Sequence, residues 1–182
     1  MMKKICSWIR KISRTAVLLS LMVLYLLIIL VMFPAFATEA YVSPLDLLFH
    51  YSPDQAYALI ESYGAEVRHS YVVSTLTLDV IYPLTYSLLF SVWLSMLLKG
   101  QGRFNCAVIM LPFVILLFDL LENSGIVIML LNYPQRLDII AQLTSMATSI
   151  KWIFAVAVIL LTLCLSLLRL FQYLLRNKSK HP

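Results

Sequence analysis

The chain is poor in charged residues. Only 13% of its 182 residues are Asp, Glu, Lys or Arg, whereas 62% are hydrophobic. Soluble domains average about 25% charged and about 45–50% apolar residues, so this composition excludes an ordinary soluble globular domain. The mean hydropathy of +0.89 is typical of a membrane protein.

Motifs of several enzyme classes are absent as well. The sequence has no HExxH, no P-loop and no glycine-rich phosphate-binding run. Its three cysteines form no CxxC pair, which argues against redox chemistry, and we expect no disulfide. No histidine lies in a long apolar run, which argues against Ser–His or Cys–His hydrolases of the membrane interior. His50 and His69 fit no compact metal-ligand spacing, so we expect neither a metal nor a cofactor.

Four apolar runs are long enough to cross a membrane. Hydrocarbon about 30 Å thick requires about 20 residues of helix, each rising about 1.5 Å. The runs cover residues 15–36, 71–98, 106–131 and 143–168. Buried helices of soluble proteins usually show shorter apolar runs of about 10–14 residues. The sequence therefore predicts an all-α fold, a four-helix transmembrane bundle.

Basic residues gather on one side of these predicted spans. Eleven of the 14 Lys and Arg residues lie in segments 1–14, 99–105 and 169–182, whereas the two other connections hold only Arg68 and Arg136. The positive-inside rule then places both termini in the cytoplasm. We interpret the basic segments as topology signals and contacts with membrane lipids, with no nucleic acid as partner. We expect an integral protein of a bacterial inner (plasma) membrane.

The beginning of the chain has two interpretations. A basic segment, an apolar run and Ala35-Phe36-Ala37 resemble a secretory signal with a cleavage site. The apolar run from Ala16 to Phe33 is 18 residues long, however, whereas signal sequences usually have about 7–15. This length favours a retained first span. If the segment is cleaved, three spans remain and the C-terminus still faces the cytoplasm.

The largest predicted connection is the outer loop 37–70, which contains a helix. In Ser52-Pro53-Asp54-Gln55, serine caps the helix, proline takes its first position and glutamine completes a capping box. Gly64 is a natural stop, so we predict an amphipathic helix over 53–63. The apolar segment from Pro44 to His50 is a candidate second element at the interface. The outer turn 132–142 and the cytoplasmic turn 99–105 are short, which predicts antiparallel neighbours.

Four charged side chains lie inside the apolar runs. They are Asp79, Asp119, Glu122 and Lys151. A charge in hydrocarbon costs about 2.5–3.5 kcal/mol on insertion scales, so such residues usually face a partner or a wet cavity and mark function. Counting from the cytoplasmic ends of the runs places all four in the outer half of the membrane. We therefore expect them to meet.

Helical spacing puts further polar side chains on the same faces. Because lipid offers no hydrogen bonds, the polar faces of the three spans should turn toward each other. Pro83 lacks a backbone donor and is expected either to free a carbonyl or to kink the second span beside Asp79. The three faces consist of Asp79, Tyr82 and Tyr86; of Asp119, Glu122 and Asn123; and of Thr148, Lys151 and Trp152.

This cluster has two interpretations of equal weight. In the first it is a structural network, in which Lys151 pairs with one carboxylate while tyrosines and Asn123 satisfy the others. In the second it forms a pocket open to the outside. Three acids against one base leave a surplus, so one acid should keep its proton at neutral pH. Asp119 and Glu122, one turn apart, are the expected pair to share it.

A wider set of residues resembles a group of known proteins. Asp79 to Pro83 reads D-x-x-x-P, Phe118 to Asn123 reads FDLLEN, and Lys151-Trp152 follows on the fourth span. Other matching positions are Tyr51-Ser52-Pro53, Ala56-Tyr57, Tyr63-Gly64, Tyr71, Tyr86, Leu111-Pro112 and Tyr133-Pro134. The pattern resembles small multi-pass membrane proteins with no assigned activity, over residues 44–152. Val67 departs from it, since a glycine is expected before Arg68, and the resemblance adds Arg68 as a candidate partner for the surplus acid.

Three classes of function fit these features, in the following order. The first is a binding or accessory module with an outward-facing pocket for a small polar or lipid-headgroup ligand, working with a protein partner or as a homo-oligomer. The second is a proton- or cation-coupled carrier, against which stand the small size and the scarcity of polar residues in the cytoplasmic half. The third is a membrane-embedded lipid-modifying enzyme, a class that no nucleophile motif in the sequence supports.

Overall fold

The structure is a computed structural model that describes residues 2–32, 44–99 and 105–178. All regular secondary structure in these residues is helical, which confirms the predicted all-α class. The Ala35-Phe36-Ala37 signal-like site and most of the turn 99–105 lie outside the described residues.

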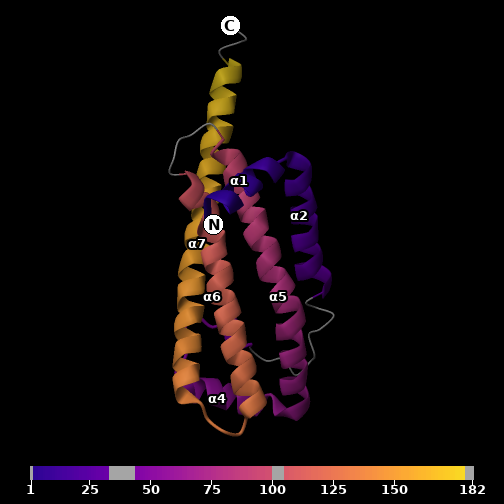
Figure 1. The fold of residues 1–182 in the computed structure, drawn as a ribbon, viewed down its shortest axis with the longest axis vertical. Helices are drawn as coiled ribbons and strands as arrows, with labels where there is room; N and C mark the ends of the chain where they lie inside the picture. Colours follow the sequence, from indigo (N-terminus) through magenta and orange to yellow (C-terminus); the bar gives the residue numbers. More distant parts are fainter. Residues whose placement is uncertain (1, 33–43, 100–104, 179–182) are drawn as a thin grey trace.

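Four described helices are long and apolar enough to cross a membrane. The first consists of α2 with a π-helical end, and the other three are α5, α6 and α7. In Figure 1, α5, α6 and α7 run side by side, and α2 packs on α5 at the edge of the bundle. Their bounds are α2 Thr15–Leu27, η1 Ile28–Met32, α5 Gly64–Leu97, α6 Asn105–Asn132 and α7 Asp138–Lys178.

Two of the helices extend beyond the predicted spans. α5 begins at Gly64 rather than at residue 71, and α7 runs from Asp138 to Lys178 rather than over 143–168. Hydropathy marks only the part of a helix that suits hydrocarbon, whereas backbone hydrogen bonds continue wherever the chain allows them. The predicted basic tail is therefore partly a helical extension of α7, which projects beyond the bundle (Figure 1).

A short helix, α4 (Pro53–Ser62), lies across one end of the bundle (Figure 1). The predicted capping box is present, because Gln55 N–H donates to Ser52 Oγ (3.2 Å) and Ser52 N–H donates to Gln55 Oε1 (2.8 Å). Gly64 has φ +69°, a conformation that favours glycine, and it turns the chain from α4 directly into α5. The capping signals in the sequence therefore located this helix well.

The opposite end of the bundle carries α1 (Met2–Ile12), which the sequence predicts only as part of a basic segment. Figure 1 shows α1 lying across the ends of the long helices, just before α2 begins. Ile9 is fully buried there, and Cys6 is buried beside it. The signal that was missed is the helical spacing of Ile5, Ile9 and Ile12, three apolar residues on one face.

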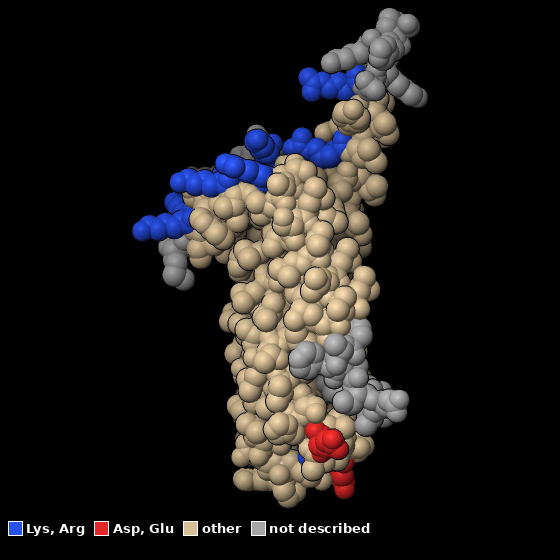
Figure 2. Space-filling model, turned by 90° about the vertical axis from the view of Figure 1, so that its right-hand side faces the viewer, with Lys and Arg blue, Asp and Glu red and all other residues tan. Residues whose placement is uncertain are grey.

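Charge divides the molecule along its long axis. Figure 2 shows Lys and Arg side chains at the α1 end, Asp and Glu side chains at the α4 end, and an uncharged surface between them. Buried apolar residues form one cluster near α4, around Ile60 and Met129, and another near α1, around Ile9 and Leu94. The polar residues predicted to meet lie between these two clusters along α5, α6 and α7.

Candidate functional site

The centre of the site is an ion pair between α6 and α7. Lys151 Nζ contacts Glu122 Oε2, and the Glu122 side chain is fully buried. Thr148, one turn before Lys151 on α7, donates from Oγ1 to Glu122 Oε1 (2.7 Å). One carboxylate oxygen of Glu122 thus contacts an ammonium group and the other accepts from a hydroxyl, so each oxygen has one partner.

Asp119 is satisfied by different partners. Tyr86 on α5 donates its hydroxyl to Asp119 Oδ2 (2.6 Å), and Asn123 Nδ2 lies 3.3 Å from Asp119 Oδ1. Asp119 and Glu122, which the sequence predicts to share a proton, therefore have separate sets of partners: a tyrosine and an amide for one, a lysine and a threonine for the other.

Pro83 shapes the backbone beside Asp79 as the sequence predicts. Proline has no N–H, so the carbonyl of Asp79, four residues earlier in α5, lacks its helical donor. Asn123 Nδ2 on α6 donates to this carbonyl (2.7 Å). The amide of Asn123 therefore joins α5 to α6 at a backbone group that only the proline makes available.

Three polar groups around this network have no hydrogen-bond partner among the described residues. Asp79 is 9% exposed as a residue, and its carboxyl makes no hydrogen bond or ion pair with the described side chains. Thr75 and Tyr51 are each 1% exposed, with hydroxyls that have no hydrogen-bond partner among the described residues. Thr75 and Asp79 lie one turn apart on the same face of α5. Tyr51 lies beside Thr148 and Glu122, and burial raises the pKa of its hydroxyl, which stays a neutral donor. Buried polar groups are nearly always satisfied, so this set is an exception that needs an explanation.

A segment before α4 closes the site at the α4 end of the bundle. It contains η2 (Leu45–Leu47), in which the Asp46 carbonyl accepts from Lys151 Nζ and Trp152 Nε1, each at 3.3 Å. Tyr71 donates its hydroxyl to Asp46 Oδ1 (2.8 Å). Sequence spacing did not identify Asp46, because its role depends on a loop that folds back onto α7.

The same segment is fixed to α7 by two serines. Ser145 Oγ accepts from the Tyr51 backbone N–H and lies 2.9 Å from His50 Nδ1, and Ser149 Oγ donates to the Phe49 carbonyl (2.8 Å). His50 is thus a neighbour of a serine hydroxyl. Within the described residues no group of three His, Cys, Asp or Glu side chains is placed to hold a metal ion.

The remaining predicted residues lie at different distances from this centre. Tyr82 packs edge-on against Tyr86 and stacks on Tyr25 of α2, so it extends the polar cluster toward the first long helix. Arg68, by contrast, makes no ion pair with an acid among the described residues. Its guanidinium donates to the Ile60 carbonyl (3.1 Å) and lies 4.3 Å from the centroid of the Tyr133 ring.

An apolar hollow adjoins the polar centre. It has a volume of about 510 Å³ and is lined by Leu47, Phe49, Trp152, Ile153 and Val156. Trp152 belongs to both parts, because its ring lines the hollow while its indole N–H reaches Asp46. A buried ionic network and an apolar surface therefore share one side chain.

A row of buried serines continues from the site along α5. Ser87, Ser91 and Ser95 are spaced four residues apart and are all buried. Ser87 Oγ donates to the Pro112 carbonyl of α6 (3.0 Å), and Ser91 Oγ has no hydrogen-bond partner among the described residues. The interior of the bundle toward α1 is therefore less apolar than the sequence suggested. A hydropathy average over a leucine-rich segment changes little when the segment contains a few serines, so it does not reveal them.

Comparison of the chain with known proteins found no relative. No protein-family model matches the chain, and no curated protein or solved structure is significantly similar to it.

Proposed function

We propose that the chain is an integral membrane protein in which α2, α5, α6 and α7 form a four-helix transmembrane bundle. The segregation of basic residues to the α1 end and acidic residues to the α4 end supports an orientation with both termini in the cytoplasm. We propose that in a bacterium the protein lies in the inner membrane, with α4 and the polar site on the outer side.

The function that the geometry supports best is ligand binding in the outer half of this bundle. The observation that carries the proposal is Asp79, a residue that is nine-tenths buried and whose carboxyl has no described partner. Glu122 and Asp119 are already satisfied, so Asp79 is the acid available to a ligand. An intramembrane acid is costly, and proteins retain such groups mainly where they serve function.

The side-chain groups without a described partner indicate the chemical class of the ligand. A buried carboxyl calls for a positive charge or a strong hydrogen-bond donor, and the hydroxyls of Thr75 and Tyr51 can each donate to or accept from a polar group. An ammonium or hydroxyl group on a small polar molecule or lipid headgroup meets these requirements. The hollow that adjoins Trp152 has an apolar lining, which favours a ligand with an acyl chain that packs against Phe49 and Trp152.

Native mass spectrometry of protein extracted with its surrounding lipid tests this proposal. We expect the wild type to carry a bound species of defined mass and Asp79→Asn to lose it, because the amide keeps the size of the side chain but not its charge. Glu61→Gln, which removes one exposed acid from α4, is the matched control and should retain the species. A wild type without any bound species, or equal occupancy in all three proteins, would contradict the proposal.

A proton- or cation-coupled carrier is the second candidate. The row of Ser87, Ser91 and Ser95 favours it, because these hydroxyls extend the polar groups of the site toward the α1 end. A carrier needs such groups on both sides of its binding site. Flux of the bound species into proteoliposomes separates the two candidates, since a binding module holds its ligand without moving it across the membrane.

A further inference from the structure

Helix α1 has two faces of opposite character. Its apolar face, with Ile9 fully buried, packs against α5 and α6. Its other face carries Lys4, Ser7, Trp8 and Lys11, whose spacing of i, i+3, i+4 and i+7 places them on one exposed stripe. Because the apolar face fixes the helix to the bundle, the stripe is held in a fixed orientation.

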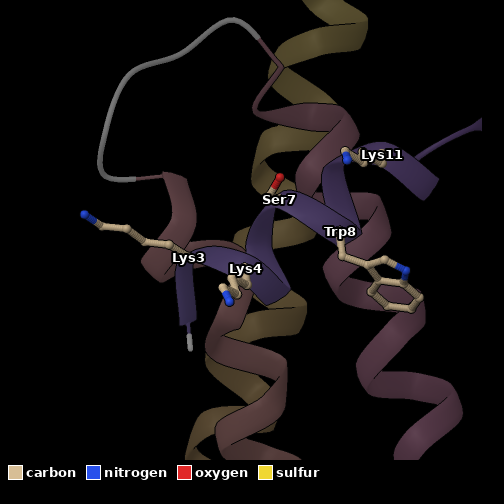
Figure 3. Close-up of a pocket in the computed structure, with 5 residues that line it drawn as sticks. All are labelled: Lys3, Lys4, Ser7, Trp8 and Lys11. Atoms are coloured by element: carbon tan, nitrogen blue, oxygen red, sulfur yellow. The ribbon is translucent and has the colours of Figure 1, made fainter.

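The stripe borders a hollow of about 310 Å³ at the surface. Lys3, Lys4, Ser7, Trp8 and Lys11 line it. Figure 3 shows these side chains spread along α1, with Lys3 and Trp8 extending to opposite sides. The lining contains three ammonium groups and a hydroxyl but no carboxylate. Helix α1 as a whole has no acidic residue. All the polar groups of the lining can therefore attract an anion or donate a hydrogen bond to it.

The position of α1 indicates which anion meets this surface. The apolar helix α2 begins at Thr15, directly after α1, so in the proposed membrane orientation α1 lies at the level of the lipid headgroups. Trp8 is 51% exposed, and tryptophan is enriched at this level because its ring is apolar and its indole N–H polar. A basic amphipathic helix with an exposed Trp in this position is typical of contact with anionic lipids.

We propose that the Lys4, Ser7, Trp8 and Lys11 stripe binds the phosphate headgroup of an anionic phospholipid. The two lysines neutralise the phosphate, the serine hydroxyl donates to it, and the indole ring rests against the glycerol and upper acyl region. This proposal rests on the proposed membrane insertion but not on the Asp79 site, which lies at the opposite end of the bundle, so failure of one binding site leaves the other untouched.

Titration of the purified full-length protein in detergent with dihexanoyl-phosphatidylglycerol, and separately with dihexanoyl-phosphatidylcholine, tests the proposal. We expect the wild type to prefer the anionic lipid and Lys4→Gln/Lys11→Gln to bind it about thirtyfold more weakly, since each basic residue near an anionic lipid contributes about a factor of five. The Lys4→Arg/Lys11→Arg variant should restore binding, because the charge is retained.

The matched control removes two basic residues of the same end that do not line the hollow. Arg10→Gln/Arg14→Gln has the same net charge as the lysine variant and should keep most of the preference for the anionic lipid. Equal weakening in both variants, or no preference in the wild type, would overturn the site. Equal competition by inorganic phosphate would overturn the assignment to a lipid.

Discussion

Lys151→Met is expected to destabilise the protein strongly, by about 3–5 kcal/mol, the usual cost of removing one partner of a buried ion pair. The substitution leaves the fully buried Glu122 with Thr148 as its remaining described donor on α7. It also removes a donor from the Asp46 carbonyl, which loosens the segment that closes the site. The measurement is the melting temperature in detergent, read by the loss of helical circular dichroism.

The double variant Lys151→Met/Glu122→Gln separates this mechanism from a general packing defect. The neutral amide introduced by Glu122→Gln needs no counter-charge and can still accept from Thr148, so the double variant should recover most of the lost stability. If the double variant is as unstable as Lys151→Met alone, the loss does not come from the unpaired carboxylate, and the ion pair is not the centre of the network.

Gly125→Ala is expected to have the second largest effect, because α6 and α7 approach each other closely at this glycine. An added Cβ would lie 1.9 Å from Thr144 Oγ1 and 3.0 Å from Thr144 Cβ. The Cβ contact is hard to relieve by rotating Thr144, so the two helices must separate. Overpacking of this kind costs about 1–3 kcal/mol. Because Thr144 lies one turn before Thr148, the separation should also weaken the contact of Thr148 with Glu122.

Thr144→Ala should partly rescue Gly125→Ala, since it removes the hydroxyl and methyl groups that clash but leaves the close Cβ. Ser124→Ala serves as the control, because Ser124 is exposed and adjacent to Gly125, and it should melt close to the wild type. Thermal melting of the four proteins checks the order. A Gly125→Ala protein as stable as the Ser124→Ala control would show that α6 and α7 do not pack as closely as described.

Much of the architecture follows from short-range signals in the sequence. Hydropathy predicts the long helices because their apolar runs exceed what a soluble helix needs, and the capping box at Ser52 predicts where α4 begins. The spacing of polar residues also predicts which faces of α5, α6 and α7 meet. What spacing cannot provide is the pairing across helices: it gives the face of Glu122 but not whether Lys151 contacts Glu122 or Asp119.

The parts that were missed depend on long-range contacts or on short segments. Asp46 joins the site because a loop folds back onto α7, and no periodicity encodes such a return. Helix α1 is only 11 residues long, too short for a hydropathy window, and its basic residues suggested a topology signal instead. Ser91 is one small polar residue among leucines. Its burial in α5 becomes evident only when the helices are packed.

The division of roles among the acids has a consequence for stability. Asp119 and Glu122 have partners on neighbouring helices, so they hold the bundle together, whereas Asp79 is a buried residue whose carboxyl has no described partner. Residues that serve binding are commonly retained at a cost to stability, and removing their charge relieves that cost. The acids should therefore respond in opposite directions when neutralised.

The most direct test is the melting temperature of Asp79→Asn beside Asp119→Asn in ligand-stripped, detergent-purified protein. If Asp79 is the free acid of a binding site, Asp79→Asn melts at or above the temperature of the wild type. Asp119→Asn should melt lower, because its amide opposes the donors Tyr86 and Asn123. A clear loss of stability in Asp79→Asn, equal to that of Asp119→Asn, would contradict a binding role and make Asp79 part of the scaffold.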